Sequence, residues 1–351
     1  MARRERVLVA MSGGVDSSVA AALLIDTGHD VTGVTLKLWG GESDSGCCSV
    51  ADVEDARRVA AQLAIPHYVF NFADDFTRDV VDPYVTAHRE GHTPNPCVEC
   101  NRSIKFGRLL ERADALGFDA VATGHHARVV RSEGGAARLF RGVDAAKDQS
   151  YVLYMLGQRE LTRALFPVGE MTKAEVRRRA ASLGLRTADK PESMDVCFIT
   201  RGGRERFLAH RGVMVPGDIV DESGVVGRHD GYARFTIGQR RGLGVAQGHP
   251  RFVVDTDAAT ATVTIGTRES LLREAETLAD LCFVGEPLSP DQLVLAQTRA
   301  HGVPAPARLV GNELRWVEPQ ARVAPGQIVA LYRRDEVVGG GRVARPIPTL
   351  R

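Results

Sequence analysis

The fold is decided by the stretch Val7-Leu8-Val9-Ala10-Met11-Ser12-Gly13-Gly14-Val15-Asp16-Ser17-Ser18. Its apolar start predicts a buried β-strand, and the alanine-rich segment that follows, to about Asp26, predicts a helix. Two adjacent glycines allow a tight turn in which backbone N–H groups approach a ligand closely. Ser17 and Ser18 stand at the helix start, where unpaired N–H groups favour bound phosphate. The sequence predicts a phosphate-binding loop, although an ordinary strand-to-helix turn would explain a lone Gly-Gly equally well.

Asp16 adds chemistry to this loop, because an acid there would repel phosphate unless a cation such as Mg²⁺ lay between them. With this acid included, the string Ser12 to Ser17 resembles the PP-loop of N-type ATP pyrophosphatases, which cleave ATP into AMP and pyrophosphate. No Gly-Lys-Ser/Thr follows, so the string is not a Walker A loop. The resemblance implies ATP and Mg²⁺ as cofactors.

Length and composition limit the number of domains and the kinds of protein that this chain can be. The 351 residues exceed the length of a typical single core, so two or three domains are expected. Hydrophobic residues make up 44% and charged residues 25%, as in an ordinary globular protein. We find no apolar stretch long enough for a membrane helix and no signal peptide, and we therefore expect a cytoplasmic protein without a membrane partner. Six cysteines in this length do not suggest a disulfide framework.

Apolar runs alternate with helical patterns over residues 1–125, which predicts a parallel sheet flanked by helices. Further strands are expected at Asp30–Lys37, Pro66–Asn71 and Ala120–Ala122, and helices at about 51–64, 72–89, 149–157 and 172–183. Ligands of such sheets bind beyond the carboxyl ends of the strands. We therefore expect the first loop, Leu36 and Gly124 to surround one crevice.

The character of the chain changes near Arg204, where short alternating segments separated by glycine and proline begin. A second break, with a short helix-like stretch, is expected between Ile265 and Leu281. The predicted domains are 1–204, a central β-rich domain at 205–270 and a C-terminal β-barrel at 271–351. Expected features are strands at 217–220, 232–237, 251–255, 292–298, 307–310 and 327–332, with a turn or bulge at 339–341. Residues 295–351 hold nine arginines against four acids, which fits either RNA binding or a solvated surface.

The cysteines give the second specific signal. Cys97 and Cys100 form a Cys-x-x-Cys just before a helix expected to begin near Arg102 or Ser103, and such a pair indicates redox or metal chemistry. Cys197 is the third candidate. We interpret Cys282 as a buried small hydrophobic residue and assign no role to Cys47 and Cys48.

Taken together, these motifs resemble those of the tRNA-specific 2-thiouridylase family of the MnmA type, a family of PP-loop enzymes. The resemblance implies a Rossmann-like domain of the adenine nucleotide α-hydrolase kind, followed by the two β domains. It extends over nearly the full length and is carried by Met11–Ser18, Thr93–Asn101, Lys105-Phe106, Ala122–His125, Lys147–Tyr151, Cys197–Ile199, Thr236–Gly244, Pro325–Gln327 and Gly339–Gly341.

The resemblance implies a sulfurtransferase. The family transfers AMP from ATP to the C2 oxygen of the wobble uridine in tRNAs for Lys, Glu and Gln, and a sulfur nucleophile then displaces AMP. By motif position Cys197 is the persulfide carrier, and Cys100 releases the sulfur by forming a Cys100–Cys197 disulfide. A sulfur donor such as a cysteine desulfurase or a sulfur-relay protein is the implied partner. Motif position further assigns ATP binding to Ala10, Met11, Ser12, Gly13, Gly14, Val15, Asp16, Ser17, Leu36 and Gly124, the target base to Cys97, Val98 and Glu99, and tRNA contact to His125, Lys147, Asp148, Gln149, Arg299, Ala300 and Gln327.

One departure leaves the sulfur chemistry open. Many family members have Asp where this chain has Cys97, so that Cys97, Cys100 and Cys197 form a possible set of three ligands for a [4Fe–4S] cluster that delivers sulfide. The persulfide scheme is slightly favoured. A different PP-loop enzyme, such as a tRNA lysidine synthetase or an amidotransferase-linked synthetase, would not need these cysteines, and a non-enzymatic RNA-binding protein would not need Asp16.

Overall fold

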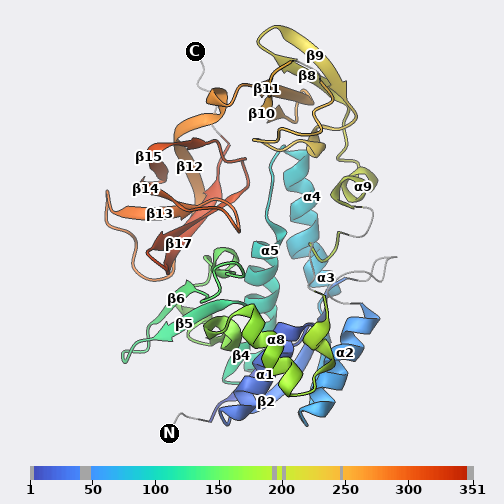
Figure 1. The fold of residues 1–351 in the computed structure, drawn as a ribbon, viewed down its shortest axis with the longest axis vertical. Helices are drawn as coiled ribbons and strands as arrows, with labels where there is room; N and C mark the ends of the chain where they lie inside the picture. The colour runs from blue at the N-terminus through green and yellow to red at the C-terminus, as the bar shows by residue number, and fades with distance from the viewer. Residues whose placement is uncertain (1–3, 40–48, 192–195, 200–202, 246–247, 346–351) are drawn as a thin grey trace.

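The computed structural model describes residues 4–39, 49–191, 196–199, 203–245 and 248–345. Its N-terminal domain contains a parallel sheet of five strands in the order β3-β2-β1-β4-β7. Val7, Leu8 and Val9 are fully buried, because helices cover both faces of the sheet. The expected parallel α/β architecture is therefore confirmed (Figure 1). Its strands are β1 (Arg6–Ala10), β2 (Asp30–Lys37), β3 (His67–Asn71), β4 (Ala120–Ala122) and β7 (Ala164–Leu165).

Helices connect and cover these strands. Those expected at 51–64, 72–89 and 172–183 are confirmed, and Thr172 and Glu175 form the capping box of the last. The helical elements are α1 (Val15–Asp26), α2 (Val50–Gln62), α3 (Ala73–Phe76), the π-helical η1 (Thr77–Val81), α4 (Asp82–Arg89), α5 (Pro96–Glu99), the π-helical η2 (Cys100–Arg108), α6 (Leu109–Ala115), α7 (Gln158–Leu161), α8 (Lys173–Ser182) and α9 (Gly203–His210), with 3₁₀ turns at η3 (Ser150–Val152), η4 (Pro167–Glu170) and η5 (Arg186–Asp189).

Two expectations about helices are wrong. The helix that carries the Cys-x-x-Cys begins at Pro96 rather than near Arg102, because the Asn95 side chain accepts a hydrogen bond from the Cys97 N–H and proline suits the first helical position. Residues 149–157 do not form a helix beyond the 3₁₀ turn η3. The Asp148 carboxylate accepts the Ser150 N–H there, and such local side-chain bonds compete with helical ones.

The central domain is a four-stranded sheet in the order β10-β11-β8-β9. The expectation of a strand at 232–237 is wrong, because Tyr232–Arg234 form the 3₁₀ turn η6. The Tyr232 hydroxyl donates to the carbonyls of His88 and Arg89 at the end of α4. This docking holds the chain in a turn. The strands are β8 (Gly217–Asp221), β9 (Gly224–His229), β10 (Phe252–Asp257) and β11 (Thr262–Gly266).

The C-terminal domain is an antiparallel barrel of six strands, closed by pairing of β12 with β17. Only the 3₁₀ turn η7 (Glu269–Leu271) stands where a short helix was expected in this described stretch. Gly339–Gly341 lie within β17, where side chains would overlap the neighbouring strands, and the register with β16 shifts beside them, as a bulge requires. The barrel strands are β12 (Leu272–Phe283), β13 (Leu293–Gln297), β14 (Ala305–Val310), β15 (Glu313–Ala321), β16 (Ile328–Arg333) and β17 (Glu336–Val343).

A hairpin of the N-terminal domain extends the barrel sheet. Its strands β5 (Ala127–Arg131) and β6 (Ala137–Arg141) follow β4, and β6 pairs with β17. In Figure 1 this hairpin lies directly below the barrel. The two domains are therefore joined by backbone hydrogen bonds.

Candidate active site

The predicted phosphate loop joins β1 to α1 at the carboxyl ends of β1 and β4, where the strand order reverses. Gly13 has a φ of +71°, and a Cβ there would overlap the Asp52 carbonyl. Gly124 follows β4, and a Cβ there would lie 2.6 Å from the Ser17 nitrogen. Both glycines are therefore required by close backbone contacts, and the structure brings Gly124 against the loop as expected.

Hydroxyl groups close the loop internally. The Ser17 Oγ accepts a hydrogen bond from the Ser12 N–H at 3.2 Å and donates to the Gly14 carbonyl at 3.2 Å. The Ser18 Oγ also donates to that carbonyl, at 2.8 Å. Ser12 is exposed and Gly14 half-buried. The loop therefore reaches solvent at Ser12 and Gly14, just before α1, where the helix dipole favours an anion.

Asp16 is held by the side chains of His126 and Lys173, and no sequence pattern indicated the lysine. Its carboxylate accepts from the Lys173 Nζ at 2.7 Å and lies 3.1 Å from the His126 Nε2. Burial raises the pKa of Asp16, but the hydrogen bonds from His126 and Lys173 outweigh burial, and the pKa lies below its ordinary value. In this structure, therefore, Lys173 supplies positive charge beside the acid.

A second lysine ties the loop to the segment that leads toward Cys197. The Lys190 Nζ donates to the Gly13 carbonyl at 3.0 Å and to the carboxylates of Asp52 at 2.6 Å and Asp55 at 2.7 Å. Lys190 and Gly13 are 177 positions apart. No local sequence pattern signals such a contact.

The structure brings Cys100 and Cys197 to the same apolar cluster. Cys100 is buried in it, Cys197 is half-buried against it, and Ala10 and Leu36 contact it as well. Phe198, only 1% exposed, anchors the Cys197 segment. Its ring packs against those of Trp39, Phe76, Tyr84 and Phe207. The two predicted catalytic cysteines and two predicted ATP-binding residues therefore share one side of the sheet.

Cys97 differs from Cys100 and Cys197 in exposure, because it is exposed in the first turn of α5. Among the described residues, which include Cys97, Cys100 and Cys197, no group of three or more His, Cys, Asp or Glu side chains is arranged to hold a metal ion. The three-cysteine ligand set expected for a cluster is therefore not assembled in this structure. Cys47 and Cys48 lie outside the described residues.

The predicted base and tRNA residues near the first domain differ in exposure. Val98 is buried against Phe106, and Glu99 is half-buried. His125 is buried, and its Nδ1 lies 2.6 Å from the Thr123 Oγ1. Burial, reinforced by the nearby Lys105 charge, holds the pKa of His125 well below its ordinary value. His125 is therefore a neutral imidazole at physiological pH.

The remaining predicted tRNA residues lie after the hairpin or on the barrel. Gln149 is exposed, and its Oε1 accepts the His126 N–H at 2.9 Å, next to the Asp16 contact. Arg299 and Ala300 are exposed after β13. The Gln327 amide donates to the Thr93 carbonyl at 2.7 Å, just before α5. The barrel thereby contacts the segment that leads into the Cys97 helix. Lys147 is half-buried and Asp148 is buried.

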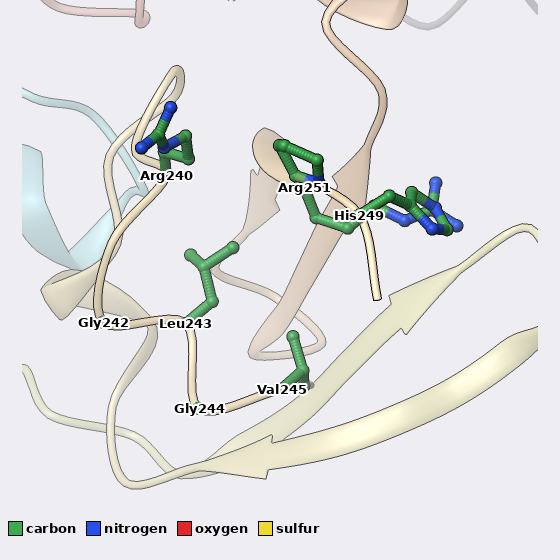
Figure 2. Close-up of a pocket in the computed structure, with 8 residues that line it drawn as sticks. Arg240, Gly242, Leu243, Gly244, Val245, His249 and Arg251 are labelled. Atoms are coloured by element: carbon green, nitrogen blue, oxygen red, sulfur yellow. The ribbon is translucent and has the colours of Figure 1, made fainter. Parts of the chain in front are cut away.

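A separate cavity of about 510 Å³ lies in the central domain. Figure 2 shows Leu243 in its middle, with Arg240 on one side and His249 and Arg251 on the other. Arg251 is engaged by Glu222 at 2.9 Å. The central sheet lies at the opposite end of the molecule from α1, so this cavity is not part of the loop site (Figure 1).

This fold and loop define a class: an ATP-binding α/β domain of the PP-loop kind that carries two appended β domains. Family models match over the same three parts, described as a tRNA methyl transferase HUP domain (residues 5–201), a tRNA methyl transferase PRC-barrel domain (205–267) and an aminomethyltransferase beta-barrel domain (277–343).

Comparison with curated relatives shows the family within this class. The tRNA-specific 2-thiouridylase MnmA of Chloroflexus aurantiacus is 50% identical, over 97% of this chain and 98% of that protein. Its namesake from Geobacter metallireducens is 47% identical, over 96% of each. The chain belongs to the MnmA family of tRNA-specific 2-thiouridylases. A solved structure of a 4-thiouridine synthetase–RNA complex with bound ATP matches 55% of this chain and 45% of that one, at 18% identity and a TM-score of 0.37.

Proposed function

We propose that the protein is a tRNA-uridine 2-sulfurtransferase that uses ATP to activate the C2 oxygen of the wobble uridine in tRNAs for Lys, Glu and Gln. The observation that carries this proposal, beside membership of the family, is the position of Cys100 and Cys197 on the apolar cluster that also contacts Ala10 and Leu36, at the end of the strand that leads into the loop. This shared packing supports a site in which ATP and the two cysteines would act together.

In the first step, the C2 oxygen attacks the α-phosphorus of ATP, and pyrophosphate leaves. We assign nucleotide binding to Ala10–Ser17, Leu36 and Gly124. The start of α1 would stabilise the departing charge through its N–H groups. Mg²⁺, which binds ATP phosphates together with one or two carboxylates, would be held by Asp16 and would neutralise that charge. Lys173 and His126 would keep the Asp16 carboxylate ionised and oriented, as their hydrogen bonds support.

In the second step, the terminal sulfur of a Cys197 persulfide attacks C2, and AMP leaves. The Cys100 thiolate then attacks the Cys197 sulfur, so that the S–S bond of the persulfide breaks, a Cys100–Cys197 disulfide forms and the sulfur stays on uracil. The shared cluster supports a close approach of the two residues. A reductant and a sulfur donor, such as a cysteine desulfurase or a sulfur-relay protein, must restore the persulfide.

For the tRNA, we propose that the base reaches the site beside Cys97–Glu99 after it is flipped out of the anticodon. His125, Lys147–Gln149, Arg299-Ala300 and Gln327 would contact the RNA around it.

The functional units would be residues 1–204 for catalysis and 205–270 and 271–351 for the two β domains. In the described part of the chain, no helix has the length and apolar character that a membrane crossing needs. We propose a cytoplasmic location.

The alternative sulfur source is a [4Fe–4S] cluster on Cys97, Cys100 and Cys197. These side chains do not form a ligand set among the described residues. Anaerobic purification with iron and acid-labile sulfide assays, followed by thiolation of tRNA with and without metal, separates the two schemes. Thiolation by iron-free protein supports the persulfide, whereas thiolation that requires stoichiometric iron overturns it.

A further inference from the structure

Asp148, which stands between Lys147 and Gln149 in the sequence, is part of a buried hydrogen-bond network where the hairpin meets the barrel. Its carboxylate, 5% exposed, accepts four hydrogen bonds within the protein. The donors are the Arg141 Nη1 at 2.7 Å, the Gly142 N–H at 3.1 Å, and the Ser150 N–H at 3.1 Å and Oγ at 2.9 Å. A carboxylate with so many internal donors holds the backbone around it. Lys147 and Gln149 are thereby fixed on either side.

Arg141 connects Asp148 to the barrel by hydrogen bonds. Its Nη2 donates to the Gln297 Oε1 at 2.6 Å, and its guanidinium lies 3.6 Å from the centre of the Tyr332 ring. The Tyr332 hydroxyl lies 3.1 Å from the Ser150 Oγ, which closes the network. A planar guanidinium that stacks on a ring and binds two partners has little freedom to move. Asp148 and Gln297 therefore keep a fixed separation.

Gln297 ends the network at an exposed turn. The side chain is 2% exposed, and its Nε2 donates to the carbonyls of Arg299 and Ala300, at 2.9 Å each. The Gln297 amide oxygen therefore accepts from Arg141 in the interior, and the amide nitrogen donates to the exposed turn. Neither Arg141 nor Gln297 was indicated by the sequence, and both are needed to connect the two predicted contact segments.

We infer that Arg141 and Gln297 are positioning residues for tRNA: they hold Lys147–Gln149 of the catalytic domain and Arg299-Ala300 of the barrel as one composite surface. The inference rests on the proposed function, because it requires that Arg299 contact the tRNA backbone. Arg141 and Gln297 act through the exposed segments and do not touch the substrate.

Gln297→Glu is the sharpest test. A glutamate oxygen can still accept from Arg141, but its other oxygen would face the carbonyls of Arg299 and Ala300 and repel them. Gln320→Glu is the control, because it adds the same charge to the same barrel at a half-buried site on β15, where the Gln320 Nε2 donates to the Glu318 carbonyl. The Kd for unmodified tRNA is measured by filter binding at several salt concentrations, for both variants and for Arg299→Ala. The Kd for ATP serves as the folding readout.

We expect Gln297→Glu and Arg299→Ala each to weaken tRNA binding about tenfold, as loss of one charge-assisted contact would. The slope of log K against log salt falls by about 0.7–0.9 in both, the value for one phosphate contact, which general destabilisation would not produce. The double variant is no weaker than Arg299→Ala alone. ATP binding and the Gln320→Glu control stay within twofold of wild type.

Three results would overturn the inference. Additive losses in the double variant would show that Gln297 does not act through Arg299. A wild-type slope and Kd for Gln297→Glu, with Arg299→Ala impaired, would remove the inference but leave the proposed tRNA surface intact. If Arg299→Ala itself bound tRNA normally, the proposed surface at the barrel would be wrong and the inference would fail with it.

Discussion

Replacement of Gly124 by alanine tests the loop geometry directly. A Cβ there would lie 2.6 Å from the Ser17 nitrogen and 2.8 Å from two Asp16 carbons, whereas ordinary contact begins at 3.4 Å. Val121 and Ala122 of β4 are fully buried, so the strand has little room to retreat. The first turn of α1 must therefore move by the difference between 3.4 and 2.6 Å, about 0.8 Å.

This displacement is large enough to break a phosphate contact. A hydrogen bond of about 2.9 Å, stretched by that amount, exceeds the range in which N–H···O bonds form. A hydrogen bond to a charged group contributes about 1.5–3 kcal/mol, so ATP binding should weaken roughly 10- to 100-fold. Binding is measured by isothermal titration calorimetry, with ATP–pyrophosphate exchange as the activity readout. Both readouts should fall together.

Gly134→Ala is the matched control, because Gly134 is exposed in the turn between β5 and β6 and its nearest neighbour, the Ser132 Oγ, lies at 3.9 Å. It should bind ATP as the wild type does. A folded Gly124→Ala protein whose Kd for ATP lies within twofold of wild type would show that ATP binding does not depend on this close contact.

Three further predictions concern the loop acid, the cysteines and the helix cap. Because hydrogen bonds lower the pKa of Asp16 despite burial, its carboxylate stabilises the fold above the ordinary pKa of 3.8. Urea unfolding should therefore show a deficit for Asp16→Asn at about pH 5 that shrinks as the pH falls below 3.8; a deficit that keeps growing below pH 3.8 would contradict the ion pair. Cys197→Ser should abolish 2-thiouridine, detected by nucleoside mass spectrometry, with tRNA affinity unchanged, whereas Cys282→Ser should retain activity; thiolation by Cys197→Ser would remove its assigned role. Asn95→Ala, which deletes the cap on the Cys97 N–H, should lower the free energy of unfolding by about 1 kcal/mol, and an unchanged urea midpoint would argue against the cap.

Local patterns account for the features that the sequence predicted well. The strand at Val7–Val9 and the loop after it follow from an apolar run and adjacent glycines, which are local properties of the chain. The capping box at Thr172 and Glu175 is likewise a local signal. The failures at 102, 149–157 and 232–237 have a common cause, because each depends on a side chain that captures a particular backbone group.

Long-range contacts account for what the sequence could not indicate. Lys173 reaches Asp16 across 157 positions, and Arg141 reaches Gln297 across 156. Both depend on how the finished domains pack. The pairing of β6 with β17 is of the same kind, because a hairpin in one predicted domain completes the sheet of another. Motif resemblance identified Cys100 and Cys197, but only the fold shows that they share an apolar cluster with Leu36.

A single-turnover experiment follows ATP cleavage and sulfur transfer in the same reaction. Iron-free protein, preloaded with persulfide on Cys197, is mixed with ATP and a tRNA transcript for Lys, Glu or Gln, and the products are quantified by mass spectrometry. The proposed mechanism predicts one AMP, one pyrophosphate and one wobble 2-thiouridine per turnover, together with a Cys100–Cys197 disulfide. Formation of 2-thiouridine without ATP cleavage, or ATP cleavage to AMP with the sulfur still on Cys197, would contradict it.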